Sequence, residues 1–162
     1  MAMDQFLELD GIKGESTDKV HKEKIDVLAW SFSGNNSGSA HQGGGAGSGK
    51  SSFSDLSITK YIDKSSPVLW KCVSTGEHIP KGTLYVRKAG GKAPIEYWKI
   101  EMTECLVTSL STGGSGGEDR LTENVALNFA KFKVIYQEQK PDGSKEGGEI
   151  PFTYDIAGNA PE

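Results

Sequence analysis

Residues 121–138 read LTENVALNFAKFKVIYQE, and the order of large and small side chains in this stretch decides the fold class. Apolar residues stand at odd positions from Val125 to Phe129 and at even positions from Phe132 to Tyr136. Alternation with a period of two indicates a β-strand that turns one side toward a core. The change of parity at Ala130–Lys131 predicts a bulge or a barrel corner, where one long strand bends from one sheet into another.

Similar alternation recurs along most of the chain, so the protein is predicted to be mainly β. In residues 24–33, large apolar groups stand on both parities, which predicts a strand that is covered on two sides. The pattern as a whole predicts a compact antiparallel β-barrel or a pair of packed sheets. Further strands are predicted at residues 5–10, 24–33, 53–62, 83–88, 95–111 and 150–154.

One short α-helix is predicted to flank the β-structure, at about residues 66–75. Ser66 is the predicted N-cap, Pro67 stands at the first helical position, and Gly76 is the predicted stop. A helix this short depends on tertiary packing for its stability. The stripe predicted to pack against the sheet consists of Val68, Leu69, Cys72 and Val73.

Composition limits the possible partners and compartments. A chain of 162 residues with a net charge of −4 fits a single domain over residues 1–162, and its lysines are scattered, which argues against binding to nucleic acid. It contains no run of eighteen apolar residues, so no membrane insertion is expected. The first residues lack the apolar core of a secretory signal. We therefore expect a protein that is synthesised and starts in the cytoplasm.

Residues Gly44–Ser51 match the phosphate-loop pattern G-x-x-x-x-G-K-[ST], which raises the alternative of nucleotide binding through Lys50. That motif needs a buried strand before it and a helix after it, so that backbone N–H groups surround the phosphates. Residues 35–42 contain no apolar run, and residues 53–62 alternate as a strand does. We therefore interpret residues 34–50 as a long glycine-rich loop.

The remaining histidines and cysteines do not have the spacing of a catalytic or ligand-binding motif, so no catalytic residue, cofactor site or metal site is predicted. His21, His41 and His78 lie in separate loop-like contexts without the spacing of metal ligands. Cys72 and Cys105 are interpreted as small buried hydrophobic residues.

Four blocks of the sequence closely resemble the haemolysin-coregulated protein (Hcp) family of bacterial type VI secretion, and the similarity runs from the N-terminus to about residue 155. The resemblance implies a β-barrel with a flanking helix, a homohexameric ring, and rings stacked into the inner tube of a contractile injection machine. It also implies the spike and the sheath and baseplate as partners, small effector proteins carried in the lumen, release to the extracellular space without a signal peptide, and no enzymatic activity. The blocks are Gly14-Glu15-Ser16 with His21, Ile25–Ser31, Lys60–Ser65 and, above all, Ser111–Val125.

In such a ring, one strand should line the lumen. Small groups at Ala29, Ser31 and Ser33 alternate with Trp30 and Phe32, which favour a core. We therefore predict that Ala29, Ser31 and Ser33 face the channel and the effector, although the parity of the partner strand could reverse this assignment.

The two glycine-rich loops, residues 34–50 and 111–119, are the candidates to reach across the joint between stacked rings. In the second loop, Glu118 and Asp119 are expected to be solvated or to pair with Arg120. A monomeric β-barrel binding module remains a further alternative. The predicted stacking residues are Gly43, Gly44, Gly45, Gly47, Gly49 and Lys50 in the first loop and Gly113, Gly114, Gly116 and Gly117 in the second.

Overall fold

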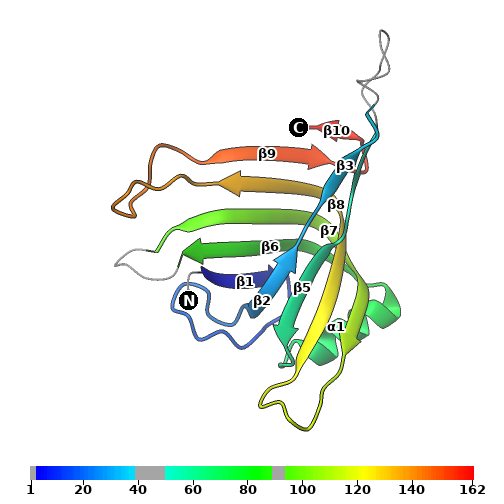
Figure 1. The fold of residues 1–162 in the computed structure, drawn as a ribbon. Coiled ribbons are helices and arrows are strands. Elements are labelled where there is room, and N and C mark those ends of the chain that lie inside the picture. The colour runs from blue at the N-terminus through cyan, green and yellow to red at the C-terminus, as the bar shows by residue number, and fades with distance from the viewer. Residues whose placement is uncertain (1–2, 39–49, 89–93) are drawn as a thin grey trace.

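The computed structural model describes residues 3–38, 50–88 and 94–162, which form a closed antiparallel barrel with one flanking helix (Figure 1). Neighbouring strands of the barrel follow the order β8-β5-β2-β1-β6-β7, and β7 pairs with β8 to close it. A sheet closed on itself in this way leaves no open edge around the barrel. The barrel strands are β1 (Met3–Leu9), β2 (Ile25–Ser31), β5 (Leu56–Tyr61), β6 (His78–Lys88), β7 (Glu96–Thr112) and β8 (Thr122–Tyr136).

The two longest strands, β7 and β8, pair with each other along most of their length, and β8 changes its other neighbour partway. The first half of β8, Thr122–Leu127, pairs with β5, whereas the second half, Lys131–Tyr136, pairs with β9 (Ile150–Asp155). The part of the sheet in which the first half of β7, the second half of β8 and β9 pair with one another is called the wing below, and β6 continues it on the other side of β7 (Figure 1). Short strands complete the fold: β10 (Ala160–Pro161) pairs with β9, and β3 (Gly34–Asn36) pairs with β4 (Ser51–Phe53).

The predicted corner lies where the barrel meets the wing. The buried positions of β8 are odd up to Phe129 and the next is Phe132, so the predicted change of parity occurs there, but Ile135 is buried as well and Tyr136 is exposed. The facing strand β7 makes the same change between Met102 and Cys105, where Glu104 has a positive φ of 55°. Because both strands change their buried parity at the same place, the register in which β7 pairs with β8 is the same before and after the corner. The corner is thus formed by two strands, and a bulge confined to β8 is the wrong alternative.

A bulge does occur in β2. The pairing of β2 with β5 shifts between Val27 and Ala29, so Leu28 is the extra residue and is 39% exposed. Ile25 and Val27 face the core before the bulge, and Trp30 packs against the core after it. The prediction of a strand covered on two sides is therefore wrong. Apolar residues occur on both parities because the buried parity changes within the strand.

Helix α1 spans Ser66–Thr75, the range predicted from the sequence, and lies against the outside of the barrel (Figure 1). Leu69 and Cys72 are buried, whereas Val68, predicted to belong to the packed stripe, is 38% exposed. Gly76 ends the helix in the left-handed conformation, with φ 72°, and its N–H donates to the Cys72 carbonyl.

The predicted N-cap is wrong by one residue. Ser65 occupies the cap position, and no side chain caps the helix there. The Ser66 hydroxyl is engaged elsewhere, because it donates to Glu123 at 2.5 Å inside the barrel wall. The Ser66 hydroxyl, which was predicted to cap the helix, therefore binds a buried carboxylate instead.

Candidate assembly surfaces

The three residues predicted to face a channel lie on one exposed side of the chain. Ala29, Ser31 and Ser33 are exposed, while Trp30 and Phe32 on the other side are partly buried against the core. The Phe32 ring anchors this arrangement, because its centroid lies 5.2 Å from that of Phe132 and 5.6 Å from that of Phe129.

The exposed side continues across four strands as two rows of small, uncharged residues. One row is centred on Ser31 and the other on Ala29, and each crosses β2, β5, β8 and β7 through directly paired residues. Thr59 and Asn124, neighbours in the second row, are joined by a hydrogen bond of 2.8 Å. We call this surface the neutral face. Its rows are Ser31, Ser57, Ala126 and Ser109, and Ala29, Thr59, Asn124 and Ser111.

Charged residues border the neutral face but are held by neighbours. The Asp55 carboxylate accepts hydrogen bonds from Thr108 at 2.5 Å and from Asn128 at 2.9 Å. Arg120, near the opposite margin, lies over the Tyr61 ring at 3.7 Å from its centroid. The face between them therefore presents hydroxyl, amide and methyl groups to a partner.

Behind the neutral face lies a buried ionic cluster that the residue types did not predict. The Lys60 ammonium is fully buried and donates to Glu123 at 2.5 Å, and its nitrogen lies 3.1 Å from the Asp63 carboxylate. Glu123, which is 1% exposed, also accepts from Ser66 and, at 3.1 Å, from Thr112. These contacts join β5, β8, β7 and the start of α1.

The glycine-rich loop between β7 and β8 lies at one end of the barrel (Figure 1). Gly113, Gly114, Gly116 and Gly117 are all exposed there. Neither Glu118 nor Asp119 pairs with Arg120 among the described residues, so of the two expectations for these carboxylates, solvation agrees with the structure. The neighbouring Ile62 N–H donates to the Leu121 carbonyl, which fixes the loop's return beside the end of β5.

The β3–β4 pair, whose strands flank the other glycine-rich segment, lies at the opposite end of the barrel (Figure 1). Lys50 is exposed, and its backbone N–H and carbonyl contact Ser37. Ser51 begins strand β4, and β5 comes next, so the chain after Lys50 is extended and does not form the helix that a phosphate loop requires. Gly43, Gly44, Gly45, Gly47 and Gly49 lie outside the described residues.

The connection between β1 and β2 is held to the barrel by an ionic contact and a histidine. Arg87, which is buried, donates two hydrogen bonds to Asp18, at 2.6 and 3.1 Å, and a third to Asp4. The Arg87 guanidinium holds the pKa of Asp18 well below its ordinary value.

His21 supports the same connection from within the barrel wall. Lys24 donates to His21 Nδ1 at 3.0 Å, so Nε2 carries the proton that it donates to Glu96. The His21 ring stacks on Phe6 with centroids 4.6 Å apart. Both ring nitrogens therefore serve a structural purpose.

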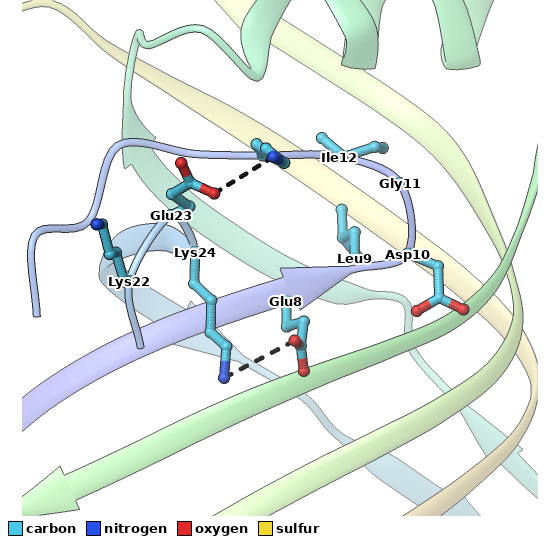
Figure 2. Close-up of a pocket in the computed structure, with 9 residues that line it drawn as sticks. Glu8, Leu9, Asp10, Gly11, Ile12, Lys22, Glu23 and Lys24 are labelled. Carbon is cyan, nitrogen blue, oxygen red and sulfur yellow. Dashed lines mark ion pairs between the residues drawn. The ribbon is translucent and has the colours of Figure 1, made fainter. Parts of the chain in front are cut away.

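A cleft of 290 Å³ lies between the end of β1 and this connection (Figure 2). Its charged side chains face one another: Lys13 pairs with Glu23 at 3.4 Å and Lys24 with Glu8 at 3.8 Å. These pairs close the connection over β1, and the cleft offers a ligand few charges that are not already compensated.

The two cysteines lie in the interior of the described part of the chain. Burial raises the pKa of the Cys105 thiol to about 12, and both Cys105 and Cys72 are buried and free. Three or more metal-ligating side chains do not gather among the described residues. Within residues 3–38, 50–88 and 94–162, no helix is long and apolar enough to cross a membrane.

The wing carries a patch of exposed apolar side chains. Ile150 is 61% exposed, Phe152 49% and Tyr136 38%. Ile150 pairs directly with Tyr136, and Phe152 pairs with Val134 on the next strand position of the same face. The patch is continuous across two strands, as contact surfaces between proteins are.

Comparison with known proteins identifies the family. The family model described as type VI secretion system effector, Hcp, matches residues 6–136. The chain is 56% identical to protein hcp1 of Pseudomonas aeruginosa over 159 residues, which cover 98% of each chain. It is 39% identical to the crystal structure of Hcp1 from Salmonella typhimurium, with full coverage of both chains and a TM-score of 0.83. A structure titled as a type six secretion system protein aligns with a TM-score of 0.92 at 29% identity, covering 99% of this chain and all of that one. The chain therefore belongs to the Hcp family of type VI secretion proteins.

Proposed function

We propose that this protein is the structural subunit of a type VI inner tube, in which six copies form a ring, rings stack end to end, and small effectors travel in the lumen. It starts in the cytoplasm and leaves through the secretion machine without a signal peptide, together with the spike, inside the sheath and above the baseplate. It catalyses no reaction of its own. The observation that carries the proposal is the neutral face.

A wall that small proteins slide along should lack large and charged side chains. The two rows through Ser31 and Ala29 meet that requirement across four strands, a width of about 14 Å at the usual strand spacing. An uncharged face neither attracts nor repels cargo over long distances, so cargo can be held weakly and released. Ala29, Ser31 and Ser33 are therefore proposed as lumen residues, with Ser57 and Asn124 beside them.

The wing supplies a surface for joining neighbours around the ring. A closed ring of identical subunits needs two different patches that meet head to tail. The apolar patch of Ile150, Phe152 and Tyr136 is proposed as one of them, since apolar and aromatic residues form the centre of such contacts.

The two glycine-rich loops are proposed to meet at the joints between rings. They leave the barrel at opposite ends of the β5–β8 pair (Figure 1), so the loop of one ring would meet the other loop of the next.

Native mass spectrometry of the purified protein tests the ring directly. We expect a dominant species with the mass of six chains, and ring-shaped particles of matching size by electron microscopy. A species that stays at the mass of one chain at every concentration up to about 100 µM would contradict the ring and favour a monomeric binding module.

Replacing Ser31 by Arg is expected to leave rings intact and to lower effector retention by about tenfold, the equivalent of roughly 1.4 kcal/mol. The larger, charged side chain would project from the neutral face and meet cargo without a counter-charge. Retention is measured as the amount of small protein that co-purifies with rings from cells of the native host. Ser31→Ala is the matched control and should retain cargo. If Ser31→Arg breaks the ring, Ser31 lies in a subunit contact and the lumen assignment is wrong.

A further inference from the structure

Two shallow depressions lie at opposite ends of the barrel, and each holds one charged residue among its described lining residues. The first, of 430 Å³, lies between β4 and the end of β9, and its charged residue is Lys50. The second, of 360 Å³, lies at the loop between β7 and β8, and its charged residue is Glu118. The chain from Lys50 through β4 and β5 to Ile62 runs from one end to the other (Figure 1).

The charges at the two ends have opposite sign and no partner within the described part of the chain. The hydrogen bonds of Lys50 are made by its backbone, so its ammonium is left unpaired there. The Glu118 N–H donates to Ser115, but its carboxylate joins no ion pair, and neither does that of Asp119. Arg120, the nearest cation in the sequence, is occupied by the Tyr61 ring.

The surroundings of Lys50 favour a contact with a carboxylate. Its depression is lined by Phe53, Tyr154 and Ile156, and the rings of Phe53 and Tyr154 lie 5.3 Å apart. An ion pair beside apolar groups is screened less by water than one on an open surface. The Tyr154 and Ser51 hydroxyls at its wall lie 3.1 Å apart, and Tyr154 donates to Asn159 at 3.0 Å, so the Lys50 ammonium is the donor left for a partner.

We propose that the Lys50 end of one copy docks on the Glu118–Asp119 end of a second copy of this chain, and that this charge pairing sets the head-to-tail direction of stacking. The two ends are different and complementary, so the contact is open-ended, and like ends repel each other. This inference rests on the proposed tube, because the ring of six copies sets how many Lys50–Glu118 contacts form at one joint. It adds which residues meet at the joint and why the joint has a polarity.

Charge reversal followed by mixing tests the proposal. Rings of Lys50→Glu carry acidic groups at both ends, and rings of Glu118→Lys/Asp119→Asn carry lysine at both ends without the neighbouring carboxylate. Each exposed pair is worth about 1.5-fold to 5-fold in the association constant, and six pairs act together in one joint, so each variant alone should stack at least about tenfold more weakly than the wild type. An equimolar mixture of the two variants should recover stacking, because every joint can then bring opposite charges together. Sedimentation velocity in 50 mM salt, with tube lengths counted by electron microscopy, measures both effects.

The control is Lys81→Glu, which makes the same change in net charge at an exposed residue of β6 and should stack as the wild type does. The proposal is overturned if either variant alone stacks normally, or if the mixture stacks no better than its components while both form rings. A wild type that forms no rings defeats the proposed tube instead. The mixture then still reports on the contact, since end-to-end association of single copies should follow the same pattern.

Discussion

Lys60→Met is expected to lower the free energy of unfolding by about 3–5 kcal/mol, a large part of the roughly 5–15 kcal/mol that stabilises a typical domain. The substitution keeps most of the side-chain volume but removes the ammonium that lies 2.5 Å from Glu123 and 3.1 Å from Asp63. Because Glu123 is 1% exposed, its carboxylate would stay buried without a counter-charge. Urea unfolding followed by circular dichroism measures the loss.

The double variant Lys60→Met/Glu123→Leu separates the charge effect from the loss of packing. It removes the fully buried Lys60–Glu123 pair and leaves Asp63, which still accepts from Ser65, so it should be more stable than Lys60→Met alone, because removing a buried pair costs less than orphaning one member. Helix α1 should lose protection against amide exchange in the single variant, since Ser66 contacts the same cluster. A single variant within about 1 kcal/mol of the wild type would show that the cluster is not a determinant of stability.

Leu127→Ala is the second change with a large expected effect, a loss of about 2–5 kcal/mol. Leu127 is fully buried and stands where three barrel strands meet, since it pairs with Leu56 on β5 and with Val107 on β7. Neighbours on both sides are fixed by backbone ladders, so the cavity left by the truncated side chain can collapse little.

Leu121→Ala is the matched control, because the same atoms are removed from a leucine that is 41% exposed in the loop before β8. We expect a smaller loss of about 1–2 kcal/mol there, because this side chain already has much of its surface in water in the folded protein. Equal losses at the two positions would mean that the barrel interior repacks around the smaller side chain at residue 127. Thermal and urea unfolding of both variants provide the comparison.

Much of the fold follows from local patterns. The alternation at residues 121–138 predicts both the strand and the corner at Ala130, because a strand that buries one side carries an apolar residue at every second position. The helix is also local, since its Pro67 and Gly76 signals lie within twelve residues of each other. By contrast, β6 begins at His78, ahead of the predicted start at residue 83. The sequence pattern missed these residues because Pro80 and Gly82 are residue types that usually interrupt a strand. Gly82 is paired on both sides, with Leu9 and Met102, and the position favours glycine because an added Cβ would lie 2.8 Å from the Leu9 side chain.

The candidate surfaces depend on pairing between distant segments. Lys60 has the same parity as the buried residues Leu56 and Ile58, which was a sign of its burial. A buried lysine can be predicted only when its ionic partner is known, however, and Glu123 lies 63 residues away in the sequence. The neutral face likewise needs the register of four strands, so Ser57 and Ser109 could not be grouped with Ser31 from the sequence.

The uninterrupted passage of β7 and β8 from barrel to wing has a mechanical consequence. The strands are 17 and 15 residues long and stay hydrogen-bonded to each other through the corner. A pull on the wing therefore loads that ladder along the strand direction, where many hydrogen bonds resist together, and no flexible linker absorbs the strain. Under a sudden pull on the wing, the subunit should yield as one unit, with barrel and wing failing at the same force.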